Sequence, residues 1–297
     1  MVTIGVAHFV IVLLGELFSI VAAFLWAGST IVAAKTLKRV SPLTANAVRT
    51  ASASISMLFV ASVMGGLTDL FRSDLYGSLM VIGAALVGFG LGDTCLYWSI
   101  GLVGISRSYT IGYSYPFFVM AFATLLLGES LLPKHLIGST LVFLGIATVF
   151  ADRGVKLEQE GRKKGLALAI VTAVLWSIGT ILVATGLITV SIIQANTMRF
   201  PLLGLILMAA SRLQSRRSNM DRRSLILLVL SGLLGMTLAG VIFLFSIQLI
   251  GVSRAAPLSS SSPVWAALMS SIFLKEKISL RIILSALAVV AGTYFLL

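Results

Sequence analysis

Long apolar runs, each of helical length, alternate with short polar breaks along the whole chain. A transmembrane helix needs about 20 predominantly apolar residues to cross the hydrocarbon layer of a bilayer. Ten runs approach this length, and we predict one helix for each. The predicted helices are 14–34, 43–65, 77–99, 106–127, 134–151, 166–187, 192–211, 224–247, 253–273 and 279–297. The expected fold class is an all-α integral membrane protein with ten transmembrane helices.

The apolar pattern and its polar interruptions occur twice, in the same order. "FLWAGSTI" (24–31) matches "VLWSIGTI" (174–181), and "ANAVR" (45–49) matches "ANTMR" (195–199), both at a separation of 150 residues. "WSIGLVGISR" (98–107) then matches "FSIQLIGVSR" (245–254) at a separation of 147 residues. This conserved order predicts an internal duplication.

The duplication sets the expected domain organisation. We predict a first five-helix repeat over 1–151, a charged linker over 152–165 and a second five-helix repeat over 166–297. Because each repeat has an odd number of helices, the second copy enters the membrane from the opposite side. The two repeats are then inverted, a design that recurs in secondary transporters.

One repeated segment is polar and contains proline, although its surroundings are apolar. "GISRSYTIGYSYP" (104–116) in the first copy corresponds to "GVSRAAPLSSSSP" (251–263) in the second. Proline removes a backbone donor, and broken backbone deep in a membrane is tolerated where it is buried or lines a cavity. The sequence therefore predicts that this segment lines a central cavity. The candidate cavity residues are Tyr109, Tyr113, Pro116, Ser259, Ser260 and Pro263.

Composition supports a membrane location and limits the possible partners. The chain has 297 residues, 58% apolar and 11% charged, whereas soluble domains have about 45–50% and about 25%. Its net charge of +12 comes from bases in short loops, so we do not expect nucleic-acid binding. One cysteine and two separated histidines suggest no metal site, and no motif indicates a cofactor.

The loop charges also predict an orientation. Seventeen of the 22 lysines and arginines lie in alternate loops that share one side of the membrane. The positive-inside rule places that side in the cytoplasm and both termini outside.

The motifs together resemble the EamA-type branch of the drug/metabolite transporter superfamily. The residues that carry the resemblance are "LW" in helices 1 and 6, the basic residue in helices 2 and 7, and the S-R…P segments followed by "GE" and "KE". The resemblance covers about 15–297. It implies ten helices, a central cavity lined by helices 3, 4, 8 and 9, and transport of small organic metabolites. It also implies cytoplasmic termini, which conflicts with the loop charges.

Asp93, in "GLGDTCLYW", is the acidic residue deepest in an apolar run. A carboxylate there costs about 2.5–3.5 kcal/mol on insertion scales, so such a group normally faces a cavity or a partner. It is either a cation-binding or proton-relay group, or a structural partner of another helix or of Arg49. Tyr97 lies one turn along on the same face. The aligned position in the second repeat is Gly240, so the negative charge is asymmetric.

Arg49 and Arg199 occupy equivalent positions, one turn after Asn46 and Asn196. A guanidinium in a cavity can hold an anionic group such as a carboxylate. Alternatively, these side chains reach the headgroups or bond loop carbonyls. Their presence in both repeats favours a shared structural or gating role, and all four residues are candidates for gating or for contact with an anion.

Trp26 and Trp176 are candidates for the cavity wall, although tryptophans of membrane proteins also pack at interfaces. No catalytic constellation is present, so we do not expect an enzyme. The predicted function is alternating-access secondary transport of small organic metabolites such as amino acids across the plasma membrane, with export as the expected direction. The alternatives are efflux of cations and drugs, or a non-transporting membrane protein. The expected partners are the lipid bilayer and a small-molecule substrate, and a homodimer is compatible with the sequence.

Overall fold

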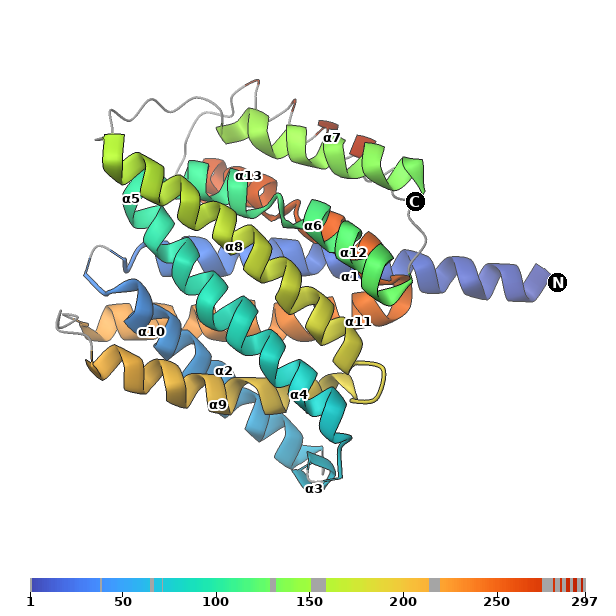
Figure 1. The fold of residues 1–297 in the computed structure, drawn as a ribbon, viewed down its shortest axis with the longest axis horizontal. Coiled ribbons are helices and arrows are strands. Elements are labelled where there is room, and N and C mark those ends of the chain that lie inside the picture. The colour runs from blue at the N-terminus through green and yellow to red at the C-terminus, as the bar shows by residue number, and fades with distance from the viewer. Residues whose placement is uncertain are drawn as a thin grey trace.

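The computed structural model of the chain describes residues 2–37, 39–64, 67–70, 72–128, 132–150, 159–213 and 220–273, with scattered positions between 280 and 295. Every regular element of these residues is a helix, and three segments, labelled η, are π-helical (Figure 1). The first half contains α1 (Val2–Ala34), α2 (Pro42–Val63), α3 (Leu67–Leu70), α4 (Leu75–Ala84), η1 (Ala85–Gly92), α5 (Asp93–Gly112), α6 (Tyr115–Phe122), η2 (Ala123–Leu127) and α7 (Pro133–Phe150). The second half contains α8 (Gln159–Gly186), α9 (Ile192–Leu213), α10 (Arg222–Gly232), η3 (Leu233–Leu238), α11 (Ala239–Ile250), α12 (Val252–Ser259) and α13 (Ser262–Phe273).

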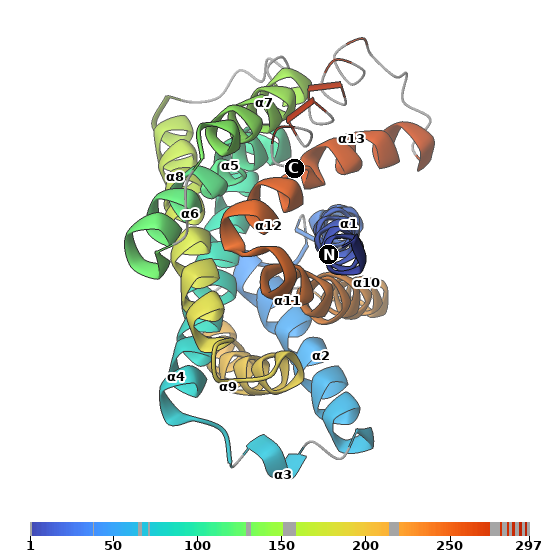
Figure 2. The ribbon, with the colours of Figure 1, turned by 90° about the vertical axis from the view of Figure 1, so that its right-hand side faces the viewer.

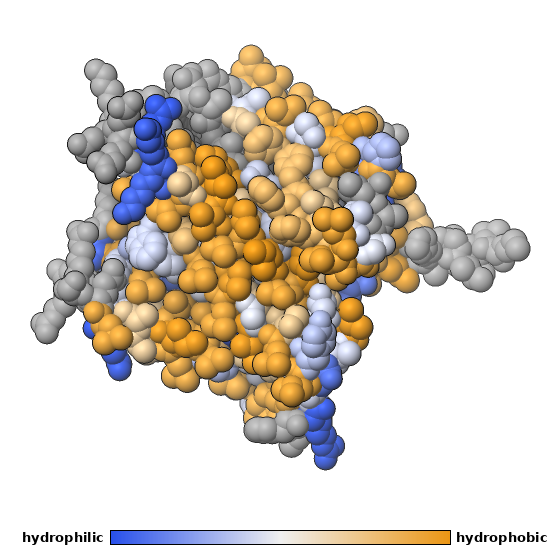
Figure 3. Space-filling model, viewed as in Figure 1, coloured by the Kyte–Doolittle hydropathy of each residue, from blue (hydrophilic) through white to orange (hydrophobic). Residues whose placement is uncertain are grey.

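The described helices have the length and surface of a multi-pass membrane protein. Five spans are long and apolar enough to cross a membrane: Phe9–Ala34, Leu75–Val103, Gly161–Gly186, Ile192–Leu213 and Arg222–Ile250. Apolar side chains cover the visible middle of the molecule, and hydrophilic ones gather toward opposite edges (Figure 3). The all-helical membrane fold is thus confirmed. The predicted tenth helix, 279–297, lies largely outside the described residues.

The two halves exchange partners in a symmetric way. Helix α1 of the first half packs along α11 of the second, while α8 of the second packs along α5 of the first, and α2 packs along α9 (Figures 1 and 2). One hydrogen bond is repeated at both crossings. Ser246 Oγ donates to the Gly15 carbonyl, and Ser99 Oγ donates to the Gly165 carbonyl, each at a distance of 2.7 Å. The duplication seen in the sequence therefore corresponds to equivalent packing of the two halves.

Helix starts are duplicated as well. Asp74 caps α4 by accepting from the Gly77 amide at 2.7 Å, and Asp221, 147 residues later, caps α10 by accepting from the Ser224 amide at 2.9 Å. These hydrogen bonds favour the charged carboxylates, so the pKa of each aspartate is lowered. Because the folded-state pKa is depressed, the stabilisation is present at neutral pH and is lost only when the pH falls through the lowered values.

The proline segments break their helices in equivalent places. The first break is at Tyr113–Ser114, and the second is at Ser260–Ser261. Pro116 and Pro263 then lie in the first turn of a new helix, where the missing amide donor costs nothing. The predicted start of a helix at 106 is wrong, because α5 continues through the expected loop to Gly112. In the second half a real break precedes α12 at Gly251, which has a φ of 76°.

A close helix crossing depends on Gly232, at the end of α10. A Cβ atom built there overlaps the Arg49 carbonyl oxygen of α2 and lies 3.0 Å from the Arg49 carbonyl carbon. We expect Gly232→Ala to destabilise the protein by about 1–3 kcal/mol, because two backbones must separate. Thermal unfolding in detergent measures this change. The matched control is Gly101→Ala on α5, where an added Cβ meets nothing within 4 Å. A Gly232→Ala protein that melts at or above wild type would contradict the close crossing.

Candidate functional site

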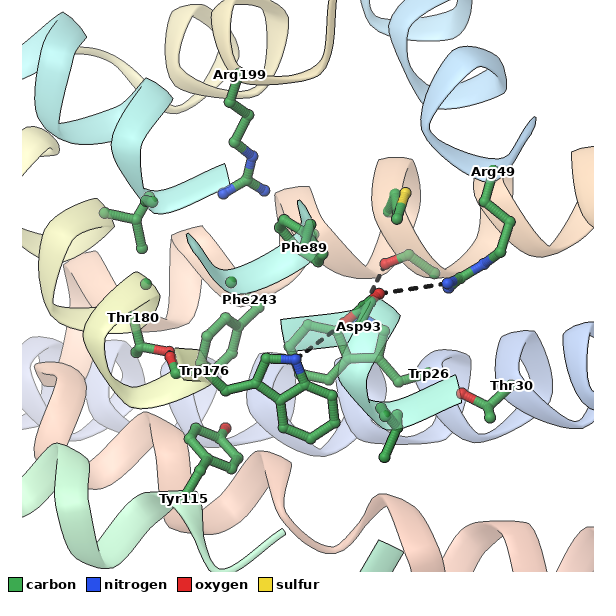
Figure 4. A pocket seen from close by; sticks show the side chains of 18 of the residues that line it. Trp26, Thr30, Arg49, Phe89, Asp93, Tyr115, Trp176, Thr180, Arg199 and Phe243 are labelled. Carbon is green, nitrogen blue, oxygen red and sulfur yellow. Dashed lines mark hydrogen bonds and ion pairs between the residues drawn. The ribbon is translucent and has the colours of Figure 1, made fainter. Parts of the chain in front are cut away.

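A cavity of about 120 Å³ lies between the two halves of the protein. Its walls come from α1, α2, α4, η1, α5 and α6 of the first half and from α8, α9, η3 and α11 of the second. Figure 4 shows side chains from both halves pointing toward this space. The resemblance implied that the predicted helices 3, 4, 8 and 9 line the cavity. Residues of the first three, 77–99, 106–127 and 224–247, do line it. The ninth, 253–273, contributes none of the described lining residues. Helices α1, α2, α8 and α9 contribute instead.

Most of the lining consists of pairs of residues at equivalent positions in the two repeats. The pairs are Trp26 and Trp176, Thr30 and Thr180, Arg49 and Arg199, Gly88 and Gly235, Phe89 and Met236, Asp93 and Gly240, Leu96 and Phe243, and Tyr97 and Leu244. The first three pairs have the sequence separation of 150, and the others have 147. The cavity is therefore built largely from one pattern used twice, and the tyrosines of the first half break its pseudo-symmetry.

Arg49 is the centre of a buried polar cluster at one end of the cavity. Its Nη1 donates to Asp93 Oδ2 at 3.3 Å and also to the Tyr97 hydroxyl. Its Nε donates to Ser231 Oγ at 2.9 Å, and its Nη2 donates to Ser29 Oγ at 3.3 Å. Each nitrogen of the guanidinium therefore has a partner, and its charge is balanced by a carboxylate. The sequence left open whether Asp93 is a structural partner of Arg49, and the two side chains are in contact.

The two tryptophans use their indole N–H groups in different ways. Trp176 Nε1 donates to Asp93 Oδ1 at 2.9 Å, so Asp93 accepts from both halves of the protein. Trp26 Nε1 donates to the Gly235 carbonyl at 2.8 Å. Gly235 lies in η3, and π-helical segments are frequent at functional sites. The tryptophans thus fix the two halves around the cavity as well as lining it.

The π-helical segments η1 and η3 lie at equivalent places in the two repeats. The Phe89 carbonyl of η1 accepts from Asn46 Nδ2 at 2.7 Å, as the Gly235 carbonyl of η3 accepts from Trp26. Asn46 therefore lies behind the lining and supports η1. Asn196 is also absent from the lining, and its Oδ1 accepts from Arg199 Nη2 at 2.5 Å. Both asparagines position the wall of the cavity.

An aromatic cluster forms the opposite wall. Tyr109 stacks on Tyr113 with ring centroids 5.1 Å apart, and the Tyr113 ring meets Trp176 edge-on at 5.4 Å. Tyr115 also meets Trp176 edge-on, at 5.9 Å, and lines the cavity. The predicted cavity residues Tyr109 and Tyr113 therefore lie in the wall, together with Tyr115 of the same segment.

Four predicted cavity residues lie outside the lining: Pro116, Ser259, Ser260 and Pro263. They are buried behind it, because the larger tyrosine rings occupy the space beside the cavity. The Ser259 and Tyr115 hydroxyls are hydrogen-bonded at 2.6 Å, and Ser259 Oγ donates to the Ala256 carbonyl at 2.9 Å. These residues join α6 to α12 and so support the aromatic wall.

Other lining residues were not predicted as site residues, although the repeat contained a signal for some of them. Thr30 and Thr180 were aligned within the "LW" motifs, and two lining positions of the cavity follow directly from that alignment. Phe89, Met236 and Phe243 had no such signal, because single apolar residues in an apolar chain do not stand out. Within the described ranges, no three His, Cys, Asp or Glu side chains gather into a possible metal site.

Comparisons with known proteins agree with this architecture. The model of the EamA-like transporter family matches the chain twice, over residues 13–151 and 163–297. The chain is 28% identical to an "Uncharacterized transporter" of Archaeoglobus fulgidus, over 95% of this chain and 97% of that protein. A solved crystal structure of another protein shares the fold, with a TM-score of 0.79 at 17% identity and 95% of each chain covered.

Proposed function

Because the chain belongs to the EamA-like transporter family, we propose that it moves small organic metabolites, such as amino acids, through the cavity by alternating access. Membership makes the chain a multi-pass membrane transporter that works in a lipid bilayer on a small-molecule substrate. Within this role, the proposed process is secondary transport that exports the substrate across the plasma membrane without changing it chemically.

The observation that carries the proposal is the paired lining of the cavity. Polar and ionisable side chains inside a membrane protein cost free energy to bury, and they mark the paths of substrates and ions. Here they gather in one space to which equivalent residues of both halves contribute. Transporters built from inverted repeats bind their substrates at such an interface and open it to either side by moving one repeat against the other.

Filling the cavity tests the proposal. We expect Thr180→Trp to abolish counterflow of a radiolabelled pool of amino acids and small organic acids in proteoliposomes, because the indole occupies the space between the halves. Thr180 lines the cavity, whereas Ile188, on the loop after the same helix, is 76% exposed. Ile188→Trp is therefore the matched control and should transport like wild type. Equal flux in the two variants would remove the cavity from the transport path.

A further inference from the structure

The two equivalent arginines of the cavity differ in their charge partners. Arg49 faces Asp93, whereas the position equivalent to Asp93 in the second repeat is Gly240. Arg199 is 3% exposed, and its contacts are the Asn196 amide oxygen and the rings of Phe89 and Phe200, whose centroids lie 5.2 and 4.9 Å from its Cζ. Among the described residues, no carboxylate pairs with it, and its Nε has no hydrogen-bond partner. Arg199 is thus a buried cation without an anion.

The position of the missing carboxylate directly borders the guanidinium. A Cβ atom built at Gly240 lies 3.1 Å from Arg199 Nη2, a tight contact, and 3.6 Å from Asn196 Oδ1. An aspartate at that position would therefore lie beside Arg199, whose side chain would have to shift by a few tenths of an ångström. Figure 4 shows the Arg199 guanidinium directed toward the cavity, with Phe89 beside it. The second repeat therefore has the cation of the first repeat, next to the cavity, but lacks its carboxylate.

An unpaired guanidinium in this setting favours an external anion. Arginine keeps its proton in proteins, so it cannot become neutral to avoid the cost of burial. The faces of Phe89 and Phe200 stabilise the guanidinium in part through cation–π contacts, but they carry no negative charge to balance it. A ligand carboxylate at Arg199 would supply the missing charge through charge-assisted hydrogen bonds.

The remaining lining describes the rest of the ligand. The charged residues among the described lining are Arg49, Asp93 and Arg199, so the cavity carries one net positive charge. Trp26, Phe243 and the tyrosine cluster provide an apolar and aromatic wall. The volume of about 120 Å³ is slightly below that of the engineered cavity of about 150 Å³ that holds one benzene molecule. The space therefore suits a compact apolar body with one negative group.

We propose that Arg199 is the anion-binding residue of the cavity and that the transported substrate is a small carboxylate with a compact apolar body and a net negative charge. This inference rests on the proposed transport function and, among its small organic metabolites, favours net anions over zwitterionic amino acids. A net anion is favoured over a cation, which the unbalanced Arg199 would repel. A zwitterion needs a second acceptor for its ammonium group, and Asp93 already accepts from Arg49 and Trp176.

The ligand charge is tested with four molecules that share one isobutyl body. Isocaproate is an anion, leucine a zwitterion, isocaproamide neutral and isoamylamine a cation. We expect thermal stabilisation of the purified wild-type protein by isocaproate, at concentrations at which the other three have little effect. Equal or stronger stabilisation by leucine, isocaproamide or isoamylamine would overturn the inference, as would no stabilisation by any of them.

The role of Arg199 is tested by restoring the missing carboxylate. We expect Gly240→Asp to bind isocaproate at least about tenfold more weakly than Gly240→Asn, because only the aspartate neutralises Arg199 while both side chains fill the same space. Equal binding by the two variants would remove Arg199 from the site. Arg199→Gln, which should also lose binding, is the second variant if Gly240→Asp does not fold.

Failure of this inference differs from failure of the transport function. Counterflow of leucine or isoamylamine without binding of isocaproate would leave transport standing and overturn the anion site. Binding of isocaproate that depends on Arg199, but without any flux in proteoliposomes, would support the anion site and count against transport.

Discussion

Replacing Asp93 with asparagine is expected to abolish transport while the protein still inserts in the membrane. The carboxylate accepts from Arg49 of α2 and from Trp176 of α8, so it joins one helix from each half at the cavity. Asparagine keeps one acceptor oxygen but turns an N–H₂ group toward one of these donors. It also leaves Arg49 buried without its counter-charge, which costs about 3–5 kcal/mol. Insertion should survive, because the apolar runs that determine it are unchanged.

Two measurements separate loss of transport from loss of folding. The first is proteoliposome uptake, with and without a pH gradient, alongside thermal unfolding of the detergent-solubilised protein. The second uses the double variant Arg49→Gln with Asp93→Asn, which removes both charges and returns an uncharged hydrogen-bonding pair. We expect the double variant to recover much of the stability but not the transport. Wild-type uptake by Asp93→Asn would exclude Asp93 from the mechanism.

The repeat explains how much of the site could be predicted from sequence. Trp26, Trp176, Arg49 and Arg199 were identifiable because each stands in a motif that occurs twice. A polar or aromatic residue that occurs at the same position of both copies stands out from the apolar background. In the structure these four residues line the cavity. The sequence also revealed that Asp93 has no counterpart, since Gly240 aligns with it.

The details that sequence could not provide depend on distant packing. The π-helical segments η1 and η3 have carbonyls that accept hydrogen bonds from distant side chains, such as Gly235 from Trp26. The burial of Ser259 and Ser260 depends on the size of tyrosines that lie more than a hundred residues earlier. The aromatic surroundings of Arg199 depend on where Phe89 and Phe200 place their rings. None of these is readable from spacing along the chain.

The central claim is that the cavity between the two halves opens in turn to each side of the membrane. Thr30 and Thr180 are equivalent residues of its wall, one from each repeat. We would place a cysteine at either position after changing Cys95, the single native cysteine, to serine. Each variant is then reconstituted and exposed to a membrane-impermeant methanethiosulfonate reagent from one side at a time.

Alternating access predicts that both cysteines are modified from either side, because a cavity that changes its opening exposes the same wall to both solutions. A ligand that occupies the cavity should protect both positions together. The control is Ile188→Cys, an exposed position that should react from one side only. Modification of Thr30→Cys and Thr180→Cys from the same single side, under every condition, would contradict the account.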